Sequence, residues 1–172
     1  MLANEKEAKA VALAQIRQFG DPVLKEESNQ ARVDDGLRQL AERMIRIMHQ
    51  ADGVGLAAPQ IGILRKIIVF HVDGRDHVLI NPQITWSSEE KSTQAEGCLS
   101  LANLACDVER WERIKVEGED LDGNHKVYEL EGLEARILQH EIDHLHGFMV
   151  INRTTREQRR ELMARLREMQ MP

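Results

Sequence analysis

One short segment, HEIDH at residues 140–144, constrains the fold and the chemistry of this chain more than any other. It lies within residues 133–145, where apolar side chains recur at helical spacing. Residues i and i+4 lie one above the other on a helix, so His140 and His144 face the same point. That spacing suits two ligands of one tetrahedral ion, and Glu141 can reach metal-bound water. The segment therefore predicts a metal-dependent hydrolase; two helix-surface histidines beside an unrelated glutamate are the alternative.

A third metal ligand has to come from elsewhere, because a catalytic centre usually has three protein ligands and one open position. The common metalloprotease pattern would require a histidine where this chain has Val150. Cys98, within EGCLS at 96–100, is the better candidate, since a thiolate binds borderline-soft metals well. A packed core cysteine is the alternative for Cys98, and it is the interpretation that we adopt for Cys106.

A further stretch, GVGLAAPQ at 53–60, carries little side-chain bulk, so its backbone can lie against a ligand. The side-chain amide of Gln60 could donate a hydrogen bond to a developing oxyanion. A tight helix-to-strand connection is the alternative. A phosphate-binding loop is disfavoured, because no Gly-Lys-Ser/Thr follows the glycines.

Hydrophobic periodicity places these motifs in an α+β fold. Helices are expected at 34–49, 133–145 and 154–170, and strands at 66–72, 77–80, 113–117 and 126–130. Asn81-Pro82 is expected to end the second strand, residues 87–96 to form turns, and residues 1–15 to be a loose extension. We expect one domain over residues 1–172. In it, mixed or antiparallel sheets would pack around a central metal-binding helix, followed by a C-terminal helix.

The composition is typical of a soluble globular protein of the cytoplasm. Hydrophobic residues make up 42% and charged residues 30% of the chain, and no apolar run reaches the ~18–20 residues of a membrane-spanning helix. Residues 1–9 lack the hydrophobic segment of a signal peptide. The net charge of −6 gives no reason to expect DNA binding, and we expect no membrane partner.

The C-terminal segment differs in charge from the rest of the chain. Residues 151–172 contain six Arg and three Glu, which leaves the remainder with a net charge of −9. A basic tail on an acidic body favours attraction to a polyanion. The alternative is a helix that leaves its Arg face in solvent and packs an apolar face of Leu162, Leu166 and Met169 on the domain.

Taken together, three segments resemble, in order and spacing, the signature motifs of peptide deformylases: GVGLAAPQ at 53–60, EGCLS at 96–100 and QHEIDHLHG at 139–147. The resemblance extends over about residues 16–151 and includes RQFGDPVL at 17–24. This family removes the formyl group from the N-terminal formylmethionine of new polypeptides. The resemblance implies N-formylmethionyl nascent peptides as substrates, and it makes ribosomal RNA the natural polyanion for the basic tail.

Carried over position by position, the resemblance implies a role for each motif residue. One divalent ion, Fe²⁺ in preference to Zn²⁺, Co²⁺ or Ni²⁺, would be bound by Cys98, His140 and His144. Glu141 would be the general acid/base, and Gln60 with the backbone N–H of Leu99 would stabilise the oxyanion. The residues that we expect to contact the substrate are Val54, Gly55, Leu133 and Ile137.

Two departures from the family pattern concern the surface that holds the peptide. After EGCLS the family often has a hydrophobic residue, a Pro and, a few positions later, an Arg, whereas residues 101–106 read LANLAC. The acidic residue before the first glycine motif, often Glu, is Asp52. Both leave the metal centre intact, but Ala102 and Ala105 keep open the alternative of another N-acyl amide hydrolase or small metallopeptidase with the same centre. A non-catalytic, ribosome-associated metal-binding protein is a third alternative, and the intact Glu141 and Gln60 argue against it.

Overall fold

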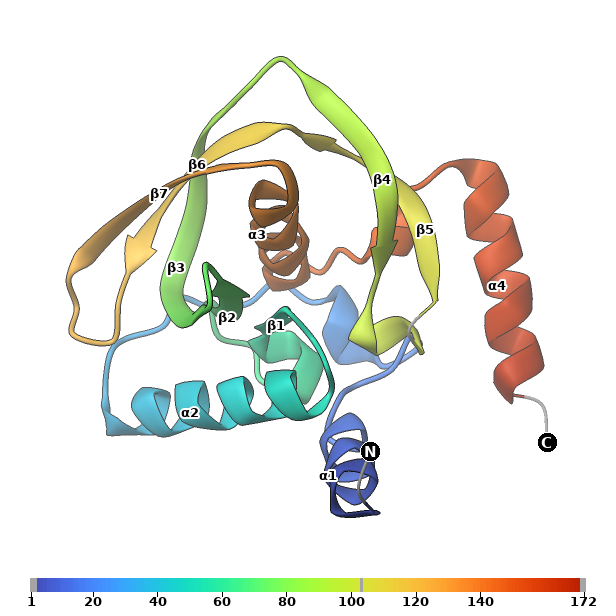
Figure 1. Cartoon of the computed structure of the whole chain (residues 1–172), viewed down its shortest axis with the longest axis horizontal. Helices are drawn as coiled ribbons and strands as arrows, with labels where there is room; N and C mark the ends of the chain where they lie inside the picture. The colour runs from blue at the N-terminus through green and yellow to red at the C-terminus, as the bar shows by residue number, and fades with distance from the viewer. Residues whose placement is uncertain (1–2, 103, 171–172) are drawn as a thin grey trace.

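Helix α3 (Gly132–Leu145) lies at the centre of the computed structural model, framed by strands on two sides (Figure 1). The structure describes residues 3–102 and 104–170. The other α-helices are α1 (Ala3–Leu13), α2 (Asp35–Gln50) and α4 (Arg156–Gln170). Short 3₁₀ helices are η1 (Pro22–Lys25), η2 (Ala58–Ile61), η3 (Leu99–Leu101) and η4 (Val150–Asn152). The strands are β1 (Gly55–Ala57), β2 (Ile67–Val72), β3 (Arg75–Ser87), β4 (Lys91–Gly97), β5 (Ala105–Trp111), β6 (Arg113–Glu119) and β7 (His125–Glu131).

These strands form two antiparallel sheets. Five strands follow one another in the order β1-β2-β3-β6-β7, and β4 pairs with β5 in a separate two-stranded sheet. Figure 1 shows α3 between the two sheets, with α4 at the outer side of β5. The predicted α+β class, with antiparallel sheets around a central helix and a helix at the C-terminus, is confirmed.

Strand β2 is buried on both faces, which explains its almost uninterrupted apolar sequence IIVFHV. Ile67 and Val69 belong to the core cluster that contains the buried face of α2. Ile68 and Phe70 belong to the cluster that contains the buried face of α3. Because side chains of a strand alternate between its faces, β2 connects both cores and lies between the two helices.

Helix α2 agrees with the helix predicted at 34–49. Asp34 is its N-cap, and the Asp34 carboxylate accepts a hydrogen bond from the backbone N–H of Leu37 at 2.7 Å. The buried face has the predicted spacing and consists of Leu37, Leu40, Ala41, Met44, Ile47 and Met48. The helix ends just before the small-residue segment at 53–60, and this places that segment at the edge of the five-stranded sheet.

The loose extension predicted at residues 1–15 is wrong for the residues that the structure describes; residues 1 and 2 lie outside them. Residues 3–13 form α1, which packs against α2. Ala12 is fully buried, and Lys9 forms an ion pair with Asp52 at 2.6 Å. Alanine, lysine and glutamate favour a helix, and this preference outweighs the low apolar content of the segment.

Asn81-Pro82 does not end the second predicted strand, since β3 continues through it to Ser87. The pairing of β3 with β6 shifts between Ile80 and Gln83, and such an irregularity tolerates a proline within a strand. Asn81 has φ 51°, and its side chain bonds both the backbone N–H and C=O of Ala31, at 2.8 and 2.9 Å. These two bonds hold the strand at the irregularity.

The turns predicted at 87–96 are also wrong, because residues 91–97 form β4. Of the seven described residues of β4, Glu96 is the only buried one. Its sequence therefore lacks the alternation of apolar and polar residues that marks a half-buried strand. The strand is instead defined by its full antiparallel pairing with β5, which the sequence interpretation missed.

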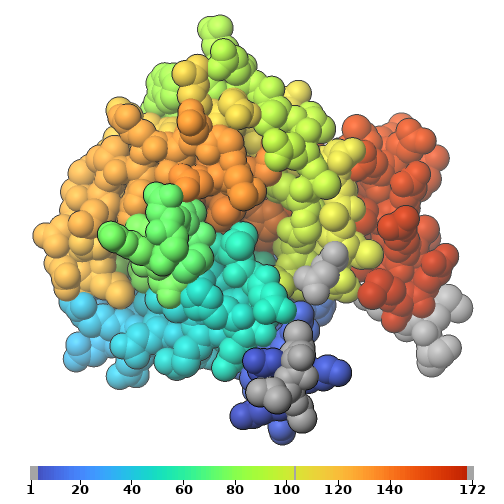
Figure 2. All heavy atoms as spheres, in the orientation of Figure 1, coloured from blue at the N-terminus to red at the C-terminus, as the bar shows by residue number. Residues whose placement is uncertain are grey.

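Helix α4 confirms the predicted C-terminal helix and forms the edge of the molecule beside β5 (Figure 2). Leu162 and Leu166 are buried in a core cluster with residues of β5, whereas Met169, expected on the same face, is 58% exposed. In the described part of the chain, no helix combines the length and apolar character needed to cross a membrane.

Candidate active site

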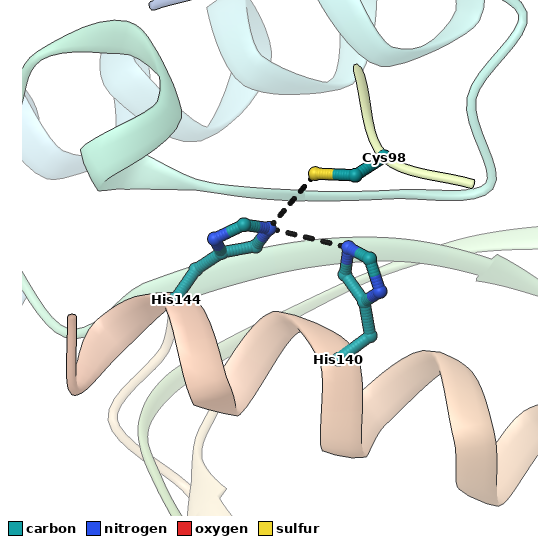
Figure 3. Close-up of side chains that lie close together, drawn as sticks. All are labelled: Cys98, His140 and His144. Carbon is teal, nitrogen blue, oxygen red and sulfur yellow. Dashed lines mark hydrogen bonds between the residues drawn. The ribbon is translucent and has the colours of Figure 1, made fainter. Parts of the chain in front are cut away.

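The three side chains nominated as metal ligands, Cys98, His140 and His144, point toward one another (Figure 3). The Nε2 atoms of the two histidines are 3.2 Å apart, and Cys98 Sγ lies 3.5 Å from His144 Nε2. With bonds of ~2.0–2.1 Å to nitrogen and ~2.3 Å to sulfur, a tetrahedral ion would separate these atom pairs by ~3.3 and ~3.5 Å. The donor atoms therefore already have the spacing of ligands around one ion.

Helix α3 and the end of β4 place these donors. The two histidines are one helical turn apart on α3, and Cys98 directly follows β4, whose last residue is paired with β5. Cys98 and His144 are 3% and 1% exposed. Burial and the neighbouring His140 lower the pKa of His144 well below its usual range. Its imidazole is therefore neutral, which is the form that binds a metal.

Glu141 follows the first histidine, and its side chain lies against Gly55 in β1. A Cβ atom on Gly55 would come within 2.9 Å of Glu141 Cγ, so only glycine leaves room at this position. Burial raises the pKa of the Glu141 carboxyl to about 7. Its Oε2 atom is buried and has no hydrogen-bond partner among the described residues. Such a carboxyl group can both accept and return a proton.

Gln60 and Leu99 supply hydrogen-bond donors beside Cys98. The side-chain oxygen of Gln60 accepts a bond from the backbone N–H of Ala57 at 2.8 Å, which fixes the orientation of the amide. The Gln60 NH₂ group consequently faces Cys98 Sγ at 3.9 Å and Ser100 Oγ at 3.3 Å. Leu99 begins η3, and the first N–H groups of a helix have no partner within it.

A pocket of about 310 Å³ opens beside these groups. Its lining includes the expected substrate contacts Val54, Gly55, Leu133 and Ile137. It also includes Gln60, Cys98, Leu99, His140 and Glu141. Val54 and Leu133 are 54% and 65% exposed, so they form an apolar rim of the kind that receives a hydrophobic ligand. All predicted site residues therefore lie at this pocket, and His144 lies behind the residues that line it.

The comparison with known families agrees with this arrangement. Residues 13–160 match the family model described as Polypeptide deformylase. The chain belongs to the peptide deformylase family. The resemblance predicted from the three motifs is thereby confirmed, and the match leaves out only residues 3–12 of α1 and residues 161–170 of α4 among the described residues.

Individual peptide deformylases are similar over most of their length. The chain is 42% identical over 152 residues to a peptide deformylase of Thermotoga sp. strain RQ2, covering 88% of this chain and 93% of the relative. It aligns with the crystal structure of a Synechococcus elongatus peptide deformylase in complex with actinonin (TM-score 0.84, 38% identity, 87% and 84% of the two chains). It also aligns with an Ehrlichia chaffeensis peptide deformylase in complex with actinonin (TM-score 0.87, 32% identity, 92% and 98%).

A buried network around Glu96 supports the candidate site, and the motifs do not predict it. The Glu96 carboxylate lies 3.0 Å from His140 Nδ1 and accepts hydrogen bonds from Arg110 (2.9 and 3.0 Å) and Arg136 (2.7 Å). Burial opposes its charge, but the bonds from His140 and Arg110 lower the pKa of Glu96 to about 2. An ionised Glu96 makes His140 Nδ1 the donor, which leaves Nε2 available on the side of Cys98.

Asp143, in the last turn of α3, extends this network. It accepts a hydrogen bond from Arg110 at 2.5 Å and two from Arg153 at 2.7 and 3.1 Å. A sequence signal for Arg110 exists, because Cys106, Val108 and Arg110 alternate as the buried residues of β5. Recognising β5 as a strand would have predicted that Arg110 points inward.

The segment that departs from the peptide deformylase pattern has its own support. Ala102 adopts a left-handed conformation (φ 50°), and its backbone N–H donates to Gln18 Oε1 at 3.1 Å. Gln18 Nε2 in turn donates to the backbone oxygen of Leu99 at 3.0 Å. Ala105 begins β5, and residue 103 lies outside the described residues. Gln18 therefore holds the chain just after Cys98, in the segment where this chain lacks the Pro and Arg that the family often has.

Proposed function

We propose that this protein removes the formyl group from the N-terminal formylmethionine of newly made polypeptides, as a metal-dependent hydrolase. One observation carries the proposal. Cys98, His140 and His144 have the spacing of ligands around one ion in a member of the peptide deformylase family. Beside them lies the buried Oε2 atom of Glu141, which has no hydrogen-bond partner among the described residues. A buried carboxylate oxygen that lacks a protein partner favours a site where a reacting molecule supplies one.

The donor set supports one divalent ion bound by Cys98, His140 and His144. A thiolate and two imidazoles suit Fe²⁺, Zn²⁺, Co²⁺ or Ni²⁺, and the family resemblance favours Fe²⁺. When bound, the ion supplies Lewis acidity and lowers the pKa of a water from ~16 toward ~7. Glu96 would keep His140 in the tautomer that presents Nε2 to it.

Glu141 would move the proton. Its carboxylate takes a proton from the attacking water and returns it to the departing amine, because an amide anion could not leave at neutral pH. The pKa of about 7 and the unpartnered Oε2 atom support both steps. Gly55 fixes the position from which Glu141 acts, since the two are in direct contact.

Gln60 and Leu99 would stabilise the negative oxygen of the tetrahedral intermediate. The Gln60 amide is oriented in advance by Ala57, so it does not have to reorganise during the reaction. The backbone N–H of Leu99, at the start of η3, would be the second donor. Removal of one such donor typically reduces turnover by ~10²–10³-fold.

The pocket would hold the peptide against β1. Strand β1 is at the edge of the five-stranded sheet, so an extended peptide can lie along Gly55 and bond its backbone. The apolar side chains of Val54, Leu133 and Ile137 would surround the methionine side chain. An unbranched thioether side chain suits an apolar pocket of this kind.

A finer part of the proposal concerns α4, which would bring the enzyme to ribosomal RNA in the cytoplasm. Its exposed side carries Arg156, Arg159, Arg160 and Arg167. The packed Leu162 and Leu166 leave this side open to a polyanion. Co-sedimentation with ribosomes at low and high salt tests this, with Arg159→Glu/Arg160→Glu as the variant expected to dissociate. Ribosome binding at low salt that does not depend on α4 would reject this role.

The substrate is tested by assaying formyl-Met-Ala-Ser, acetyl-Met-Ala-Ser and unblocked Met-Ala-Ser, with metal analysis on the same sample. We expect formate release from the first peptide alone. Cleavage of the acetylated peptide at a similar rate would indicate a broader N-acyl amide hydrolase. Cleavage of the unblocked peptide would indicate a metallopeptidase, and metal without turnover would indicate a non-catalytic binding protein.

A further inference from the structure

A second group of metal-binding side chains lies on the surface, apart from the site described above. His49 in the last turn of α2, His71 in β2 and Asp76 in β3 each offer one donor atom, and these atoms lie within 4.8 Å of one another. His49 Nε2 and His71 Nδ1 are both 2.7 Å from Asp76 Oδ1. The two imidazole rings meet edge to face, with centroids 5.2 Å apart.

The fold brings these side chains together from separate parts of the chain. His71 and Asp76 are cross-strand partners in the β2–β3 hairpin, so the sheet register sets their separation. Helix α2 packs on β2, which places its last turn next to the hairpin. In the space-filling view the green turn of this hairpin stands out on the surface beside the turquoise end of α2 (Figure 2).

We propose that His49, His71 and Asp76 form a second divalent-cation site, for Zn²⁺ or a cation of similar ligand preference. Two imidazoles and one carboxylate suit Zn²⁺, Ni²⁺ and Cu²⁺. The three side chains are 45%, 38% and 33% exposed, so water can complete the coordination. This proposal does not depend on the reaction catalysed at Cys98.

Movement of these side chains is enough to bind an ion, because their donor atoms already lie within 4.8 Å of one another. Ligands of a tetrahedral zinc lie ~3.3 Å apart, so each histidine has to move ~0.6 Å from Asp76. Partly exposed side chains have room for that shift.

An ion at this position would restrain one wall of the pocket. It would tie the end of α2 to the β2–β3 hairpin, on either side of the connecting residues 51–54. The backbone N–H of His71 donates to the oxygen of Val54 at 2.9 Å, and Val54 lines the pocket. The second ion would therefore stabilise the connection that presents Val54 to a peptide.

The test counts metal ions per chain in the full-length protein after equilibration with a modest excess of Zn²⁺ and removal of the free ion. We expect two ions in the wild type and one in the His49→Ala/His71→Ala variant. Cys98→Ala should lose the other ion and keep this one. His125→Ala is the matched control, because His125 is an exposed histidine paired with Glu117 (3.3 Å) outside the cluster, and it should retain two.

Equal numbers of ions in the wild type and in the His49→Ala/His71→Ala variant, or loss of every ion in Cys98→Ala, would overturn the proposal. A second measurement guards against misfolding: Zn²⁺ should raise the Tm of the wild type by roughly 5 °C more than that of the double variant. Equal shifts would also overturn the proposal. A failed formyl-peptide assay would leave both measurements unchanged, so the two proposals fail independently.

Discussion

Two histidine–carboxylate pairs in this protein have similar geometry and opposite surroundings. His140 Nδ1 lies 3.0 Å from Glu96, and His71 Nδ1 lies 2.7 Å from Asp76. The side chains of the first pair are 11% and 5% exposed, and those of the second are 38% and 33% exposed. Water therefore screens the second pair far more than the first. Burial, rather than distance, therefore decides how many further charged partners each pair requires.

The buried pair is surrounded by such charged partners. Glu96 is bonded by Arg110 and Arg136, and Arg110 continues to Asp143, so each charge in the group has an opposite partner. Removing one partner from such a group leaves an uncompensated buried charge. Asp76 contacts two partly exposed histidines, and water can take the place of either. The candidate metal centre at Cys98 is thus supported by a fixed network, whereas the surface cluster consists of adaptable side chains.

The largest effect is expected at Glu141, the buried carboxylate whose Oε2 has no described protein partner. Glu141→Gln keeps the shape of the side chain but cannot accept a proton, so turnover of formyl-Met-Ala-Ser should fall by ~10²–10⁴-fold with metal content unchanged. Glu134→Gln, in the first turn of the same helix and outside the pocket lining, is the control. A wild-type rate for Glu141→Gln would remove Glu141 from proton transfer.

The next effect tests the buried pair directly. Glu96→Gln should lower the free energy of unfolding by about 3–5 kcal/mol, because Arg110 and Arg136 would remain buried without their full counter-charge. Urea unfolding measures this change. Glu90→Gln is the matched control, since Glu90 pairs with Arg113 at 2.7 Å on the surface and should contribute less than ~1 kcal/mol. Equal losses would show that burial is not the deciding variable.

A third prediction concerns the contact between β1 and the buried carboxylate. Gly55→Ala would place a methyl group against Glu141 and displace its carboxylate, so turnover should fall by ~10²-fold while Cys98 and the two histidines keep their ion. Turnover and metal content measured on one sample separate the two outcomes. An unchanged rate would mean that Glu141 has other productive positions.

The residues that line the candidate site could be proposed from the sequence because each motif depends on local spacing. His140 and His144 converge through the helical repeat alone. The small residues at 53–60 indicate a close backbone approach independently of the rest of the fold. Their assembly into one pocket followed from the family resemblance. The helices with strong periodicity, such as α2, were predictable for the same reason.

The supporting network could not be predicted because it joins distant, charged residues. Glu96, Arg110, Arg136 and Asp143 come from β4, β5 and α3, and in sequence each has the character of a solvated side chain. The strand β4 was missed for a related reason, since its one buried residue is ionised. The continuation of β3 through Asn81 depends on bonds to Ala31, 50 residues away. Such pairings appear only after the chain has folded.

The smallest effect is expected at the exposed pair. Asp76→Asn should change the free energy of unfolding of chelator-treated protein by less than ~1 kcal/mol, because water replaces the lost charge interaction with His49 and His71. High salt should reduce even this difference, since screened surface charges contribute little. A loss as large as that of Glu96→Gln would mean that the short distances, and not burial, set the contribution of these pairs. A small loss, combined with the absence of the second zinc ion, would show that Asp76 serves ligand binding more than stability.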